Sequence, residues 1–170
     1  MINLSINKKV LIFGFIFTFF SSFGQSFFLG LFNPSIRGEL DITHGQFGTI
    51  YAAATICSSL VLIWFGKKID EFKLFNYSLI VIIILFSSSF LFSLINNIYF
   101  LIIAIFIMRF SGQGLMSHTS STTISRYFYK RRGRALSGIW FGLSSAEFIL
   151  PILIVFLLSI FSWRTIWQFI

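Results

Sequence analysis

The longest uncharged stretch of this chain runs from Leu74 to Met108. As a single α-helix it would be about 52 Å long at about 1.5 Å per residue, whereas the hydrocarbon core of a bilayer is about 30 Å thick. Asn96 and Asn97 interrupt the apolar character of the stretch. We therefore expect two membrane-spanning helices, at about 74–95 and 98–125.

Three other apolar stretches have the length of a membrane span, at about 10–33, 47–66 and 135–161. We expect Pro34 to close the first, because proline has no amide hydrogen and cannot continue a helix. Thr43 and Gln46 stand three residues apart before the second, which is the arrangement of a capping box.

After these spans, Trp163 and Arg164 form an aromatic and basic pair of the kind found at membrane interfaces. We expect residues 165–170 to begin a sixth span. The predicted fold class is an all-α integral membrane protein with five complete transmembrane helices plus the start of a sixth.

Composition supports this class, since 56% of the residues are hydrophobic and only 11% are charged. A soluble domain has about 25% charged residues, so this chain has too few to cover a surface in water. The net charge of +8 would suggest a nucleic-acid partner in a soluble protein. Here the basic residues occupy alternate gaps between apolar stretches, so we predict no nucleic-acid partner.

The distribution of basic residues also predicts the orientation. Cytoplasmic loops of membrane proteins are rich in Lys and Arg. Ten of the 13 basic residues lie in the N-terminal segment or in the gaps at 67–73 and 126–134. We therefore place the N-terminus and both gaps in the cytoplasm, in a multi-pass protein of the plasma (inner) membrane.

Cysteine and histidine offer no metal centre and no catalytic centre. Cys57 is the single cysteine, so it cannot form a disulfide within the chain. The two histidines, His44 and His118, are expected on opposite sides of the membrane, and zinc catalysis needs clustered ligands. We predict no metal, no cofactor and no enzymatic activity.

Several segments resemble the major facilitator superfamily. Between the second and third spans that family carries the pattern G-x-x-x-D-R-x-G-R/K, and Gly66 and Asp70 match its first two fixed positions. The remaining fixed positions differ and are occupied by Glu71, Lys73 and Leu74. Gly66 and Asp70 are thus implied to form the family's cytoplasmic loop motif.

The resemblance continues in the fourth span and beyond it. Arg109 followed by Gly112, Gln113 and Gly114 is similar to the family's intramembrane Arg with its Gln and Gly residues. The basic segment 126–135 and the Trp-Arg pair before the sixth span are also similar. The resemblance implies that residues 1–170 form the N-terminal six-helix domain, with an incomplete sixth helix, of a secondary transporter that works by alternating access. It also implies a missing C-terminal half.

The resemblance favours a small solute, and within that class a carboxylate or other organic anion. Drug–proton antiporters of this superfamily carry a Gly-Pro pair in the fifth span, where Gly142 is followed here by Leu143. Phe23-Gly24-Gln25 in the first span is similar to the importers of organic anions. The alternatives are a drug exporter, and a truncated or non-transporting membrane subunit.

Polar residues at mid-depth are the candidates for the pathway of substrate and coupling proton, because charges inside the membrane are costly, at about 2.5–3.5 kcal/mol on insertion scales. Arg109 and Glu147 are the two charged ones. Helix rise places them within about one turn in depth, so we expect them to approach each other or to share an anion or a proton. Gln25 and Ser22 in a polar stripe of the first span, and Gln113 one turn beyond Arg109, complete the set.

Overall fold

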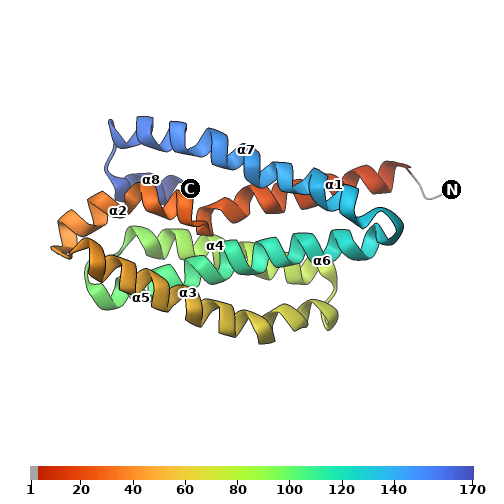
Figure 1. Cartoon of the computed structure of the whole chain (residues 1–170), viewed down its shortest axis with the longest axis horizontal. Helices are drawn as coiled ribbons and strands as arrows, with labels where there is room; N and C mark the ends of the chain where they lie inside the picture. Colours follow the sequence, from red (N-terminus) through yellow and green to blue (C-terminus); the bar gives the residue numbers. More distant parts are fainter. Residues whose placement is uncertain (1–3) are drawn as a thin grey trace.

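The computed structural model describes residues 4–170, and all regular elements in that range are helical (Figure 1). Five helical segments are long and apolar enough to cross a membrane: Lys8–Leu40, His44–Asp70, Leu74–Ser93, Ile98–Tyr127 and Tyr129–Leu158. This arrangement confirms the predicted all-α class with five complete spans.

The first span is built from two helices with a break between them. Helix α1 (Leu4–Phe20) leads into a short 3₁₀ turn, η1 (Ser21–Gly24), and α2 (Ser26–Leu40) follows. Gln25, between η1 and α2, has extended backbone angles, with φ −82° and ψ 155°. The regular α-helix of the first span is therefore interrupted at residues 21–25, which the sequence did not predict.

The prediction that Pro34 ends the first span is wrong. Helix α2 continues through Pro34 as far as Leu40. Pro34 has no amide hydrogen, so the carbonyl of Gly30, four residues earlier, loses its usual helical donor. Pro34 lies on the exposed side of α2, and no neighbouring element lies within 4 Å of a Cβ placed on Gly30, so the surroundings leave room for the helix to adjust. Proline is tolerated inside membrane helices where local adjustment accommodates such a carbonyl. The residue that follows the helix, Asp41, adopts a left-handed conformation with φ 50° and caps it.

The second span is α3 (His44–Lys67), which continues into the 3₁₀ turn η2 (Lys68–Asp70). The predicted capping box is present at its start. The Thr43 hydroxyl accepts a hydrogen bond from the Gln46 amide at 3.2 Å, and the Thr43 amide donates to the Gln46 side chain at 2.8 Å.

The third span is α4 (Leu74–Ser93), and the fourth joins three segments, α5 (Ile98–Met108), η3 (Arg109–Met116) and α6 (Ser117–Tyr127). Asn97 separates the two spans as expected, since its side-chain oxygen accepts a hydrogen bond from the Phe100 amide at 2.8 Å and caps α5. Segment η3 is a π-helix. Such wider turns are rare and occur often at functional sites.

The fifth span follows the short turn η4 (Tyr129–Arg131) and consists of α7 (Arg132–Leu158). Helix α8 (Trp163–Phe169) then begins, with the Ser162 hydroxyl accepting a hydrogen bond from the Thr165 amide at 3.2 Å. Helices α1 and α7 pack along much of their length, and both lie along the upper side of Figure 1.

Interactions at the two ends of the bundle join the connecting segments. At one end Asp70 forms an ion pair with Arg126, so the 67–73 and 126–134 gaps lie on the same side. At the other end Glu39 accepts hydrogen bonds from Trp163 Nε1, at 2.9 Å, and from Arg164, which also donates to the Ile95 carbonyl. The two basic gaps thus share one end, as their charge predicts.

Large apolar side chains lie both inside the bundle and on its outer surface. Inside, the centre of the Trp167 ring lies 4.4 Å from the centre of the Phe92 ring and 5.0 Å from that of the Phe32 ring. Outside, residues such as Trp64 and Phe86 are exposed, as expected of helices that contact lipid tails rather than water.

Candidate functional site

The break in the first span and the π-helix of the fourth span pack directly against each other. Gly24 of η1 and Gly112 of η3 meet at this contact. A Cβ added to Gly24 would lie 2.6 Å from the Gln113 amide nitrogen and 2.9 Å from the Gly112 Cα. Only glycine allows the two backbones to approach so closely.

Arg109, the first residue of η3, lies beside this contact with only 5% of its surface exposed. Its Nη1 donates to the Gly24 carbonyl at 2.9 Å and reaches the Ser26 hydroxyl at 3.4 Å. Its Nε donates to the Thr55 hydroxyl at 3.1 Å, and its guanidinium lies 5.1 Å from the centre of the Tyr51 ring. The side chain is thus held between the first and second spans.

All of these partners are neutral. Three ion pairs occur among residues 4–170, namely Lys68–Glu71, Asp70–Arg126 and Glu39–Arg164, and none of them includes Arg109. The Tyr51 ring face adds a favourable contact for a cation without cancelling its charge. Arg109 therefore carries a positive charge inside a membrane span that no carboxylate of the described part neutralises.

A small polar cavity lies against Arg109, between α3 and η3. Its volume is about 110 Å³, and its lining consists of Thr55, Ser58, Ser59, Leu62, Arg109, Gln113 and Gly114. The cavity brings together two residues that the sequence analysis selected, Arg109 and Gln113. Gln113 is exposed and has no hydrogen-bond partner for its side chain within the described part.

The α3 side of this site was missed by the sequence analysis. Tyr51, Thr55, Ser58 and Leu62 recur at intervals of three or four residues, so they share one face of the helix. Tyr51 is tied to the first span by its hydroxyl, which lies 2.9 Å from that of Ser26. The periodic polar face of α3 was the signal that could have identified these residues.

The two first-span candidates lie near Arg109 but outside this cavity. The Ser22 side chain is fully buried, and its hydroxyl donates to the Phe19 carbonyl. Gln25 is half-buried at the junction of η1 and α2, and its backbone N–H donates to the Ser22 carbonyl at 2.9 Å. In the same polar stripe, Thr18 donates to the Ile139 carbonyl at 2.5 Å and so joins α1 to α7.

The expected approach of Arg109 to Glu147 is not observed. Arg109 turns toward α2 and α3, whereas Glu147 lies exposed on α7 and forms no ion pair or hydrogen bond within residues 4–170. Helix rise gives the depth of a residue but not the direction in which its side chain points. The depth estimate alone therefore did not justify a contact.

The loop-motif residues lie at the end of the bundle with the basic gaps. Gly66 packs under the His118 ring, whose Cε1 and Nε2 atoms would each lie 3.3 Å from an added Cβ. Asp70 pairs with Arg126, as described above. These contacts join α3, η2 and α6, far along the helix axis from Arg109.

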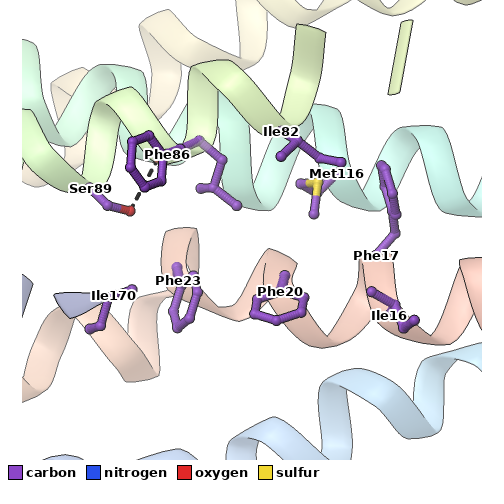
Figure 2. A pocket seen from close by; sticks show the side chains of 10 residues that line it. Ile16, Phe17, Phe20, Phe23, Ile82, Phe86, Ser89, Met116 and Ile170 are labelled. Atoms are coloured by element: carbon purple, nitrogen blue, oxygen red, sulfur yellow. Dashed lines mark hydrogen bonds between the residues drawn. The ribbon is translucent and has the colours of Figure 1, made fainter. Parts of the chain in front are cut away.

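A second, apolar cavity lies between α1 and α4 (Figure 2). It has a volume of about 260 Å³ and is lined mainly by aromatic and aliphatic side chains, among them Phe17, Phe20 and Phe86. Its one hydroxyl, from Ser89, is already bonded to the Leu85 carbonyl at 3.1 Å. This lining offers nothing to orient a polar solute, so the Arg109 site is the better candidate.

Comparison with known proteins identifies the family of this chain. The sequence model of the Major Facilitator Superfamily matches residues 14–170. No significant match was found among curated proteins or among solved structures. Proteins of this superfamily are secondary transporters of small molecules, embedded in membranes through many helices. Because the match covers most of its length, this chain belongs to the Major Facilitator Superfamily.

Proposed function

We propose that the transported solute is a small organic anion, such as a carboxylate, and that Arg109 is the group that binds it. The proposal rests on one observation, the buried guanidinium of Arg109 with only neutral partners inside a membrane span. Keeping a charge at this depth is costly, at about 2.5–3.5 kcal/mol on insertion scales, so its retention points to a role.

The free donors of Arg109 suit a carboxylate. Its Nε and Nη1 atoms are engaged by protein oxygens, whereas Nη2 has no hydrogen-bond partner within the described part. A carboxylate accepts hydrogen bonds from a guanidinium in a charge-assisted geometry, and such bonds are about twice as strong as neutral ones. The Gln113 side-chain amide lines the adjacent cavity and supplies a further donor, whereas the hydroxyls of Ser58 and Ser59 there already donate to the Thr55 carbonyl, at 2.8 and 2.9 Å.

The cavity of about 110 Å³ is small for a complete binding site, since ligand pockets commonly measure about 300–1,000 Å³. In our proposal a C-terminal half provides the facing wall, and residues 1–170 act as the N-terminal six-helix domain. Alternating access then exposes Arg109 to each side in turn as one half rocks against the other. The proposal includes the coupling of solute transport to the movement of a proton.

We also propose that the end of the bundle holding Asp70 and Arg126 faces the cytoplasm, with the N-terminus, in the plasma (inner) membrane. The support is the concentration of Lys and Arg at that end. The orientation is tested with the variants Glu71→Cys and Asp41→Cys, each exposed in intact cells to a membrane-impermeant reagent that labels cysteine. Labelling at position 71 by a membrane-impermeant reagent would contradict it.

Uptake of labelled small carboxylates into vesicles that hold the full-length protein tests the anion site, with and without a proton gradient. We expect Arg109→Gln to raise the KM for the carboxylate about 30-fold, because loss of a charged hydrogen bond costs about 2 kcal/mol. Arg132→Gln, which removes one exposed charge at the start of α7, is the control and should leave KM unchanged. Carboxylate uptake that does not depend on Arg109 would refute the assignment. A protein without uptake of any solute would support the alternative of a non-transporting subunit.

A further inference from the structure

A larger polar cavity adjoins the one beside Arg109 and lies nearer the end of the bundle where Asp70 pairs with Arg126. It has a volume of about 470 Å³ and is called here the His118 cavity. Its lining between α3 and α6 includes Gly66, Lys67, Asp70, His118, Thr122 and Arg126. Ser59 and Leu62 of α3 line both this cavity and the one beside Arg109. The two cavities therefore follow each other along α3.

The π-helix of the fourth span brings His118 onto the side of Arg109. Nine residues separate the two, and nine steps of about 100° in a regular α-helix total about 900°, which would place them on opposite sides. In η3 the hydrogen bonds span five residues instead of four, so each residue turns the helix by a smaller angle. Both side chains consequently face α3, where Arg109 bonds to Thr55 and His118 packs on Gly66.

His118 has one ring nitrogen that a solute in this cavity can reach. Its Nδ1 atom is buried and has no hydrogen-bond partner within residues 4–170. Its Nε2 atom makes only a long contact, of 3.5 Å, with the Thr122 hydroxyl. Nε2 is thus the atom of His118 that is available to donate a hydrogen bond.

The charges around the His118 cavity favour an anion. The charged residues of its lining are Lys67, Asp70 and Arg126. Asp70 and Arg126 pair with each other, so their charges largely cancel. Lys67 forms no ion pair within the described part of the chain, and its positive charge remains at the cavity.

We propose that the His118 cavity is a second binding station for the transported anion, with Lys67 as its cation and Nε2 of His118 as a hydrogen-bond donor. This inference rests on the proposed function, because the ligand is the same small organic anion that Arg109 binds. Ligand pockets commonly measure about 300–1,000 Å³, a range that includes the 470 Å³ here but not the 110 Å³ beside Arg109.

The two stations are too far apart for one small anion to occupy both. Thr55 contacts Arg109 and Gly66 contacts His118, and these two residues of α3 are 11 positions apart, about 16 Å by helix rise. The anion therefore moves from one station to the other on its way to the end of the bundle that holds Asp70.

Transport measured from each side of the membrane tests the second station. Labelled acetate, lactate and succinate are compared first, and the one with the fastest uptake is then used with full-length protein in right-side-out and inside-out vesicles. Lys67→Gln and His118→Phe should each raise the KM at least about fivefold when the carboxylate is presented at the Asp70 end, since each removes one donor to the anion. At the opposite end the KM should change less than about twofold. Phenylalanine keeps a ring to pack on Gly66 but has no nitrogen to donate.

Two further variants serve as controls. Lys68→Gln removes the next positive charge along the chain, but Lys68 pairs with Glu71 and is not part of the lining, so the KM should be unchanged from both sides. His118→Gln restores a side-chain N–H donor and should return the KM to within about twofold of the unmodified protein. If Lys67→Gln behaves as Lys68→Gln does, or raises the KM equally from both sides, the second station is refuted. Lys67 is exposed, so this comparison decides even if His118→Phe does not fold.

Failure of this inference can be told apart from failure of the proposed function. If only the second station is wrong, uptake still depends on Arg109 while Lys67→Gln matches Lys68→Gln. If Arg109 does not bind the anion, Arg109→Gln leaves uptake unchanged, whatever the result at Lys67. If none of the three carboxylates is taken up, both proposals are contradicted.

Discussion

Replacing Gly24 by alanine perturbs the contact on which the Arg109 site is built. The added Cβ would lie 2.5 Å from the Met108 carbonyl oxygen, 2.6 Å from the Gln113 nitrogen and 2.9 Å from the Gly112 Cα. All three are backbone atoms, so a side-chain rotation cannot relieve the overlap. The first and fourth spans must therefore move apart at η1 and η3.

The cost of this movement has two parts. Overpacking a tight contact costs about 1–3 kcal/mol. Separation also lengthens the 2.9 Å hydrogen bond from Arg109 to the Gly24 carbonyl, and a hydrogen bond to a charged group contributes about 1.5–3 kcal/mol. We expect a total loss of about 3–5 kcal/mol in the free energy of unfolding. At about 2–4 °C per kcal/mol for a chain of this size, the melting temperature should fall by at least about 6 °C.

Gly30→Ala is the matched control, because Gly30 lies in the same span and no atom lies within 4 Å of its added Cβ. Alanine is favoured over glycine inside a helix by about 1 kcal/mol, so this variant should melt at or above the temperature of the unmodified protein. Thermal unfolding in detergent, followed by size-exclusion chromatography with fluorescence detection, measures both variants. Equal melting temperatures for Gly24→Ala and Gly30→Ala would refute the reasoning.

Two further substitutions test contacts elsewhere in the bundle. Asp70→Asn breaks the ion pair with Arg126, but both side chains are more than half exposed, so we expect a loss of at most about 1 kcal/mol in a denaturation experiment. A loss of several kcal/mol would mean that this pair is shielded from water in the assembled protein. Thr18→Val removes the buried hydrogen bond to the Ile139 carbonyl and should lower the melting temperature by about 2–4 °C, corresponding to about 1 kcal/mol. An unchanged melting temperature would show that this bond does not stabilise the packing of α1 on α7.

The sequence predicted the helices well because the lengths of apolar stretches are limited by the thickness of the bilayer. The division at Asn97 and the capping box at Thr43 both follow from local rules and both are present. Pro34 misled the prediction because the rule that proline ends a helix is drawn from the loss of one hydrogen bond. In α2 that loss is accommodated, and the helix continues for six more residues, to Leu40.

The candidate site was predictable in part. Arg109 and Gln113 are four residues apart in one span, so their shared face follows from helical periodicity. The partners of Arg109 come from other spans, and no local pattern specifies which helices meet. Tyr51 and Thr55 could be placed only after α3 was packed against η3.

Arg109 and the break in the first span stabilise each other. Where η1 departs from regular helix, carbonyls lose the intrahelical donors that a span needs in lipid, and each unsatisfied group there costs several kcal/mol. Nη1 of Arg109 supplies a donor to the carbonyl of Gly24. The absence of side chains at Gly24 and Gly112 lets the backbones approach closely enough for that bond to form. Conversely, the break gives the guanidinium a polar partner at a depth where lipid offers none. The bond therefore offsets part of the cost of both features, and it leaves Nη2 of Arg109 with no acceptor among residues 4–170.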